Sequence, residues 1–260
     1  MRKVAAIYDI HGNLPALEAV LGDIEGAQPD LILVGGDVAT GPMPRETVDL
    51  LRSLGARARF VRGNADREVV TRHDHLDEGR ERADGDVFER ITDWTARQLT
   101  REQRDFLAAF PQSIVLQIRG LGEILFCHGS PRSDEEIITY ATPEDRMRSM
   151  LVGVAQQVVV CGHTHSQFDR VVAGTHVINA GSVGMPYEGQ PGAYWALLGP
   201  DVSLRWTSYD LQRAADSIRV CGMPGAEEFV RENVLEVPTA QEATELFERM
   251  AEERSPEGAT

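Results

Sequence analysis

The first third of the chain alternates short apolar runs with longer amphipathic stretches. The stretches at residues 13–26 and 44–54 repeat apolar side chains at helical spacing, and Asn13 stands where an N-cap is expected. Strands that alternate with helices form βαβ units, so the pattern predicts a largely parallel sheet. The apolar runs that have the length of buried strands occupy residues 4–8, 31–34 and 59–61.

The middle of the chain, residues 65–112, is charged and has the pattern of helices. Thr100 and Gln103 have the spacing of a capping box, which marks the start of a helix. This segment carries none of the metal-type residues described below, and we expect it to form the roof of a cleft. Two apolar runs, residues 113–118 and 123–127, flank a glycine-containing turn and predict a hairpin.

The last third of the chain changes to paired, antiparallel strands followed by helices. We predict one domain over residues 1–235, and a C-terminal helix with a disordered tail in residues 236–260. The apolar stripe of that helix packs on the chain's own core in our interpretation, with a partner protein as the alternative. The expected strands are residues 168–173, 176–179, 194–198 and 202–209, and the expected helices are residues 210–220, 227–233 and 239–253.

Residues of metal-ligand type stand where these apolar runs end. A mixture of imidazole nitrogen and carboxylate oxygen favours Mn, Fe, Zn or Ni over Ca or thiolate-bound Zn. Ligands of open α/β sheets gather at the carboxyl ends of the strands, and residues two apart in extended backbone share a face. We therefore expect one common site. Its candidate ligands are Asp9, His11, Asp37, Asn64, His128, His163 and His165.

The number of candidate ligands indicates two ions rather than one. Seven ligands are too many for one tetrahedral ion, and they suit a pair of ions that share a carboxylate. Asp37 is the best candidate for the shared ligand, because it stands between the other groups in the chain. The competing interpretation is that each residue is an ordinary core histidine or a Gly-Asp or Gly-Asn turn. Four of the chain's 7 histidines lie in these blocks, which disfavours coincidence.

The blocks D-x-H, G-D, G-N, a single histidine and G-H-x-H appear in this order. This pattern resembles the calcineurin-like metallophosphoesterase superfamily over residues 7–183, within its small prokaryotic phosphodiesterase-type branch. The resemblance implies an α/β fold, a four-layer α/β/β/α sandwich of two mixed β-sheets flanked by helices. It also implies two divalent metal ions, with Asn64 and His128 positioning the phosphate. One ion would be held by Asp9, His11, Asp37 and His165, and the other by Asp37, Asn64, His128 and His163.

The chain departs from the family pattern at the usual proton donor. Many members have a histidine directly after the G-N block, and phosphoprotein phosphatases pair it with an aspartate; these positions are Ala65 and Thr40 here. General acids contribute about 10²–10⁴-fold, so we expect esters with acidic leaving groups to be favoured. Asp66, His73 and His75 are alternative donors. Asp66 is interpreted as a local cap or pairing residue, and the two histidines as part of a solvated loop over residues 72–82.

Composition narrows the choice of partners. The formal net charge of −15 disfavours an extended nucleic-acid footprint, whereas a small phosphorylated substrate stays compatible because bound dications supply local positive charge. Cys127, Cys161 and Cys221 do not form a disulfide framework. No apolar run is long enough to span a membrane, and the chain shows no signal peptide, so a cytoplasmic location is expected.

The leading hypothesis is a dinuclear-metal-dependent hydrolase of a small phosphate ester. A hydroxide that bridges the two ions would be the nucleophile, and the missing proton donor favours a phosphodiesterase. The alternatives are a non-catalytic scaffold on the same fold, a nucleotide or phosphomonoester phosphatase, and a nuclease of long chains, which the acidic charge disfavours. The substrate, the native metal and a homo-oligomeric state stay open.

Overall fold

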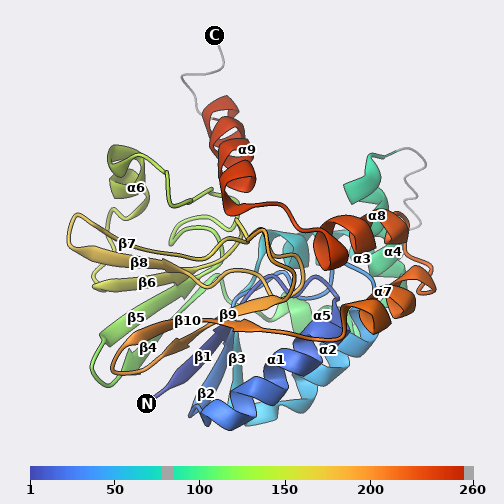
Figure 1. Cartoon of the computed structure of the whole chain (residues 1–260), viewed down its shortest axis with the longest axis horizontal. Helices are drawn as coiled ribbons and strands as arrows, with labels where there is room; N and C mark the ends of the chain where they lie inside the picture. The colour runs from blue at the N-terminus through green and yellow to red at the C-terminus, as the bar shows by residue number, and fades with distance from the viewer. Residues whose placement is uncertain (78–84, 255–260) are drawn as a thin grey trace.

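The computed structural model describes residues 1–77 and 85–254, which form two mixed five-stranded sheets packed face to face (Figure 1). The first sheet has the order β10-β9-β1-β2-β3, and the second has the order β4-β5-β6-β8-β7. The strands of the first sheet are β1 (Val4–Ile7), β2 (Leu31–Val34), β3 (Ala58–Phe60), β9 (Ala193–Leu198) and β10 (Val202–Thr207). Those of the second are β4 (Ser113–Ile118), β5 (Gly122–Cys127), β6 (Val158–Cys161), β7 (Phe168–Val172) and β8 (Thr175–Asn179).

Helices cover the outer face of each sheet and complete four layers, as the sequence predicted. Alternating residues of β1 divide between two cores: Ile7 packs on the helical side, and Ala6 packs against the second sheet. The outer face of the second sheet packs on α6 through Met147 and Met150. The helices are α1 (Leu14–Ala27), α2 (Pro44–Ser53), α3 (Asn64–Asp77), α4 (Val87–Gln98), α5 (Arg101–Ala108), α6 (Glu144–Met150), α7 (Leu211–Arg219), α8 (Ala226–Val230) and α9 (Ala240–Glu253).

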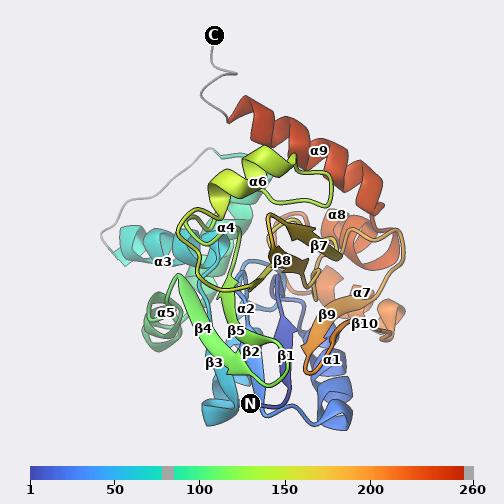
Figure 2. The same ribbon diagram turned by 90° about the vertical axis from the view of Figure 1, so that its left-hand side faces the viewer.

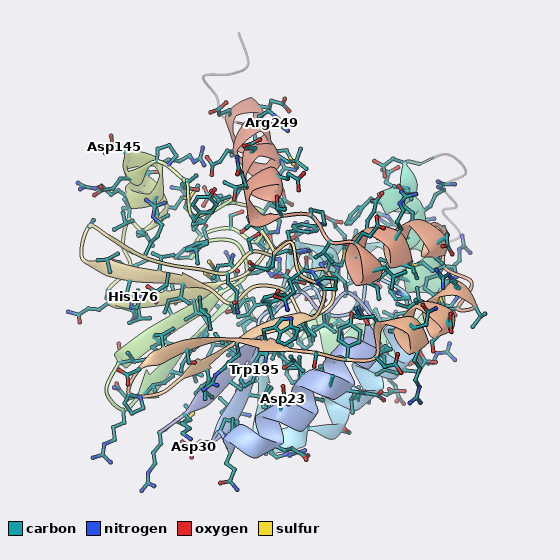
Figure 3. The ribbon with its side chains drawn as sticks, viewed as in Figure 1. Asp23, Asp30, Asp145, His176, Trp195 and Arg249 are labelled. Atoms are coloured by element: carbon teal, nitrogen blue, oxygen red, sulfur yellow. The ribbon has the colours of Figure 1, made fainter. Side chains whose placement is uncertain are left out.

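Local signals placed several helix starts correctly. The side chain of Asn13 accepts a hydrogen bond from the amide of Ala16, and Thr100 forms the expected capping box with Gln103. A polar link also joins the first sheet to α1: Trp195 donates to Thr207, and Thr207 donates to Asp23 (Figure 3). These bonds hold α1 against the strands and thereby fix the loop that precedes it.

Two expectations are wrong. The second sheet is not simply antiparallel after Cys161, because β8 pairs in parallel with β6 and only its other neighbour, β7, is antiparallel. Residues 72–77 are not a solvated loop, because α3 continues to Asp77 and buries His73. The apolar residues of α3 are too few for the sequence pattern to indicate that His73 is buried. The rest of that expected loop, residues 78–82, and nearly all of the expected tail, residues 255–260, lie outside the described residues.

The C-terminal helix α9 stands apart from the four layers, beyond α6 and α8 (Figures 1 and 2). Thr239 forms a capping box with Glu242 at its start, and the helix buries only Ala243 and Thr244. Across residues 1–77 and 85–254, no helix is long and apolar enough to cross a lipid bilayer.

Candidate metal centre

The carboxyl ends of strands from both sheets meet at one edge of the sandwich, and the candidate ligands lie there. β1 and β2 are parallel within the first sheet, and β5 and β6 are parallel within the second. Each strand therefore delivers the residue that follows it to the same edge. Asp9 and His11 follow β1, Asp37 follows β2, Asn64 opens α3 after β3, His128 follows β5, and His163 and His165 follow β6.

The backbone at five of these residues is left-handed rather than extended, so the expectation that extended backbone brings the paired ligands together is wrong. Side chains that bear a Cβ rarely adopt positive φ, and such residues cluster at functional sites. The loops turn sharply here, so both members of each D-x-H or H-x-H pair reach the same region. Among the described residues, five of the seven non-glycine positions with positive φ are Asp9, His11, Asp37, His163 and His165.

The first cluster of ligands consists of Asp9, His11 and His165. Their ligand atoms all lie within 4.8 Å of one another. The Nε2 atoms of His11 and His165 face each other at 3.2 Å, and Oδ1 of Asp9 lies 3.5 Å from Nε2 of His165. This is a compact arrangement of two nitrogen donors and one oxygen donor from two different sheets.

The second cluster consists of Asp37, His128 and His163, again within 4.8 Å. Nε2 of His128 lies 3.2 Å from Oδ2 of Asp37. The two clusters adjoin, because the same Asp37 oxygen lies 3.9 Å from Nε2 of His11 in the first cluster. Asn64 is the first residue of α3. The amide of the next residue, Ala65, donates to Oδ1 of Asp37 at 2.8 Å, which places the start of α3 beside this cluster.

Backbone carbonyls orient three of the imidazoles. Nδ1 of His11 donates to Thr40 O (3.2 Å), Nδ1 of His128 to Gly35 O (2.9 Å), and Nδ1 of His165 to Met185 O (2.8 Å). In a neutral imidazole, a hydrogen bond donated by Nδ1 leaves Nε2 free to bind a metal, which is the usual outer-shell arrangement of metal-binding histidines. Each ring is therefore held with its ligand nitrogen toward the centre.

Several buried ligand atoms have no hydrogen-bond partner among the described residues. They are Oδ1 of Asp9, Oδ1 of Asn64 and Nε2 of His128. Buried polar groups are nearly always satisfied, so three unsatisfied atoms at one place point to a bound cation. The oxygen and nitrogen donors fit a divalent transition metal, and the residues present therefore fit the two-ion site that the resemblance implied.

Electrostatics at the site are strongly perturbed. Burial by itself would raise the pKa of Asp37, but the neighbouring His128 holds it well below its usual range. Burial would lower the pKa of His128, yet the carboxylates of Asp37 and Asp9 raise it. Burial and the charge of His128 lower the pKa of His163 to about 4. The carboxylates thus attract positive charge strongly, and His163 stays neutral and able to bind metal.

Asp66 is engaged by the backbone around the site. Its carboxylate accepts hydrogen bonds from the amides of Asp37 (2.9 Å), Val38 (3.0 Å) and Gly63 (3.0 Å). Burial and the nearby charge of Asp37 raise its pKa to about 7. The neighbouring Ala65 donates its amide to Oδ1 of Asp37 at 2.8 Å. Both residues hold the loop that carries Asp37.

Close approach explains two of the glycines in the motifs. A Cβ on Gly63 would lie 2.1 Å from Oδ1 of Asp37, and a Cβ on Gly162 would lie 2.5 Å from Oδ2 of Asp9. The amide of His163 also donates to Oδ2 of Asp9 at 2.9 Å. Glycine is therefore required where the backbone runs directly against each carboxylate.

The other donors considered from the sequence lie on α3. His73 is buried within it, and His75 lines a cavity of about 540 Å³ between α3 and α4. Neither histidine belongs to the two clusters of ligand atoms. Arg67, which also lines this cavity, is bound by Asp134 at 3.1 Å.

Two aromatic residues at the site were not identified from the sequence as functional. Tyr187 stacks on the ring of His165 with centroids 4.8 Å apart, and the ring of Phe247 on α9 lies 6.3 Å from that of His163. Phe247 is one of the apolar residues at helical spacing in residues 239–253, but that spacing indicates burial only. No spacing in the chain links residue 247 to the metal-type blocks.

Comparison with known proteins shows the family to which this chain belongs. The sequence model described as the calcineurin-like phosphoesterase superfamily domain matches residues 2–199. The chain therefore belongs to this superfamily of metal-dependent phosphoesterases. The resemblance seen in the motif order is confirmed, and the fold matches as well.

Individual relatives extend over most of the chain. The crystal structure of a metallophosphoesterase from Sphaerobacter thermophilus is 29% identical, covers 88% of this chain and 96% of its own, and has a TM-score of 0.69. A hypothetical protein from Pyrococcus horikoshii has a similar fold, with a TM-score of 0.76 at 23% identity, covering 89% and 97% of the two chains. An uncharacterized protein from Methanocaldococcus jannaschii is 29% identical over 238 residues, 83% of this chain and 91% of its own.

Proposed function

We propose that this protein is a dinuclear-metal-dependent phosphodiesterase that acts on a small phosphate ester. The observation that supports this most strongly is the pair of adjoining His and carboxylate clusters, which contain buried ligand atoms without a hydrogen-bond partner among the described residues. Carboxylate and imidazole ligands at one edge of a metallophosphoesterase fold suit hydrolysis of phosphate esters.

The proposed assignment divides the ligands between two sites that share Asp37. Oδ2 of Asp37 lies 3.2 Å from Nε2 of His128 and 3.9 Å from Nε2 of His11, so this carboxylate is close to both clusters, which supports the shared role. Two divalent ions held there would supply an activated water at neutral pH and neutralise charge on the phosphoryl oxygens. The first site is Asp9, His11, Asp37 and His165, and the second is Asp37, Asn64, His128 and His163.

The chain's own residues orient the substrate in this proposal. Asn64 and His128 position the phosphoryl group beside the second site. Residue 65, where many family members have the proton-donating histidine, is a buried Ala65 methyl group, and the neighbouring Asp66 accepts hydrogen bonds from three amides. Esters whose leaving groups depart without a proton, such as aryl phosphates and nucleotide-type anhydrides, are therefore the expected substrates.

A non-catalytic scaffold is the main competing function. A scaffold has no physical need for imidazoles oriented by Thr40, Gly35 and Met185 carbonyls toward a common centre. A monoester or nucleotide phosphatase would use the same centre, and only the leaving group and the charge of its substrate would differ from those of a diester. We also propose residues 1–235 as one domain, roofed by residues 65–112, with residues 236–260 as an appended segment.

The test is hydrolysis by metal-stripped protein titrated with Mn²⁺. Bis-p-nitrophenyl phosphate should be hydrolysed in a metal-dependent way and faster than p-nitrophenyl phosphate. The reverse order would replace the diesterase with a monoesterase. No release of p-nitrophenol from either compound by protein that binds two ions would favour the scaffold.

A further inference from the structure

Two aromatic rings adjoin the candidate metal ligands, and the proposed reaction uses neither of them. Tyr187 stacks on His165, Phe247 lies beside His163, and the centroids of Tyr187 and Phe247 are 6.2 Å apart. One ring therefore adjoins the first ligand cluster and the other adjoins the second. Aromatic pairs at 4.5–7 Å are within the range of favourable ring contacts.

These rings lie on the accessible side of the site. The ligands Asp9 and His128 are fully buried, with 0% and 1% of their surface exposed, whereas His163, Tyr187 and Phe247 are half-buried. A ring that only filled the core behind the ligands would be buried like the ligands themselves. The partial exposure shows that both rings, which contact candidate ligands, keep part of their surface open to solvent.

The position of Phe247 is set by its neighbour Glu248. The carboxylate of Glu248 accepts hydrogen bonds from the hydroxyls of Thr139 (2.6 Å) and Thr142 (2.7 Å), and it forms an ion pair with Arg146. Glu248 and Arg146 are mostly buried, with side-chain exposures of 17% and 25%. Charge-assisted bonds in partly buried surroundings fix α9 in one place along its axis.

The segment that holds Glu248 is itself attached to the metal loop. The hydroxyl of Thr164 donates to Ile138 O at 2.9 Å, and Thr164 lies between the ligands His163 and His165. A continuous set of contacts therefore runs from α9 through residues 138–142 to the ligand loop. This is a rigid connection for a helix that otherwise buries little surface.

We propose that Tyr187 and Phe247 form an aromatic wall that binds the planar aromatic group of the substrate, an aryl ring or a nucleobase, while its phosphoryl group occupies the metal centre. The inference rests on the proposed function for the position of the phosphoryl group. Stacking of a base on an aromatic side chain accounts for about 10-fold or more in affinity when it is removed. The wall therefore selects aromatic phosphate esters over alkyl ones.

The test is direct binding, because binding does not depend on turnover. Phenylphosphonate and methylphosphonate carry the same phosphonate group on a bond that phosphoesterases do not cleave. Isothermal titration calorimetry with Mn²⁺-loaded full-length protein should give about 10-fold tighter binding of phenylphosphonate. In Phe247→Leu, which keeps an apolar side chain without a planar face, this preference should fall to about 3-fold or less, with the methylphosphonate affinity unchanged.

A second variant tests the helix rather than the ring. Glu248→Gln weakens the attachment of α9 and should reduce the phenyl preference in the same direction. Arg249→Gln is the matched control, because Arg249 is the next residue on the same helix and is exposed (Figure 3). The control should leave both affinities and the metal stoichiometry unchanged.

The outcomes separate this inference from the proposed function. If the wild-type protein binds the two phosphonates equally, the aromatic wall is wrong. The proposed phosphodiesterase function is not affected by that result, because it is tested by diester hydrolysis. If the protein prefers phenylphosphonate but hydrolyses no ester, the aromatic wall is supported and the proposed phosphodiesterase function is wrong. If Phe247→Leu lowers the metal stoichiometry and weakens both phosphonates equally, the ring only supports the ligands and the inference is wrong.

Discussion

The candidate metal centre and the C-terminal helix adjoin each other, yet they are built in opposite ways. The centre is made mostly of buried side chains at the ends of paired strands, with left-handed backbone at five candidate ligands. Helix α9 lies beside it and is attached through side chains, mainly Glu248, while Leu246 stays 50% exposed. The family match covers the first region and ends at residue 199, well before the second.

This difference indicates that the two regions have different roles. The centre requires precise geometry, so its strain is held by two sheets and by hydrogen bonds to each loop. A helix attached by a few polar contacts can change in sequence without disturbing the sheets. The reactive groups thus lie in the rigid region, and in our proposal the selection of the organic group lies in the less constrained one.

The largest effect should come from the shared carboxylate. Asp37→Asn removes a charge that both proposed sites share, so we expect diester hydrolysis to fall by more than about 100-fold, since even outer-shell changes cost about 10–100-fold in metal affinity or activity. Calorimetric titration with Mn²⁺ should show weaker binding at both sites. Near-normal turnover would refute the shared role. Asp145→Asn, at an exposed carboxylate on α6, is the matched control and should be unaffected (Figure 3).

Removal of metal from the candidate centre should lower the thermal stability of the folded protein. An ion present at 100 times its dissociation constant stabilises the folded state by about 2.7 kcal/mol, so chelation should lower the melting temperature by about 5 °C or more. Differential scanning calorimetry of chelated and Mn²⁺-loaded protein measures the shift. The Glu248→Gln variant should show the same shift, because α9 supplies no ligand. An absent shift in the wild type would contradict tight metal binding.

Asp66 should matter for stability more than for the chemical step. Asp66→Asn leaves one acceptor oxygen for three amides, so the free energy of unfolding should fall by about 1–3 kcal/mol. Denaturant unfolding of metal-free protein measures this loss. A variant that keeps full stability but loses turnover would instead support a role for Asp66 as the proton donor.

The same variant should change the pH dependence of stability. The pKa of Asp66 is raised from 3.8 to about 7, so the folded protein keeps a proton that the unfolded chain releases. Its contribution is complete below pH 3.8 and is lost as the pH rises through about 7. The stability difference between wild type and Asp66→Asn in metal-free protein should therefore narrow over this range as pH rises. A difference that widens with pH would contradict the raised pKa.

The smallest effect is expected on the outer face of α9. Leu246→Ala should change the free energy of unfolding by less than about 0.5 kcal/mol, because Leu246 is half exposed and surface changes are usually small. Light scattering after size-exclusion chromatography should show the same mass for both proteins. A concentration-dependent mass that this substitution abolishes would show instead that the helix forms an interface between copies of the chain.

Local chemistry in the sequence determined the ligand types, their order and the helix starts. Asn13, Thr100 and Thr239 cap helices where local spacing indicated, since capping depends on neighbours three residues away. The apolar runs predicted the strands because burial of a strand is visible in its own residues. The order of the metal-type blocks agreed with the family that the comparisons show.

Tertiary structure alone decided how these parts meet. The left-handed backbone of Asp9 and His163, the parallel pairing of β8 with β6, and the burial of His73 all depend on contacts between distant segments. Phe247 lies beside His163, 84 positions earlier in the chain, because Glu248 binds residues that precede the ligand loop. Periodicity records whether a residue is buried, but it carries no information about which distant residue it will contact.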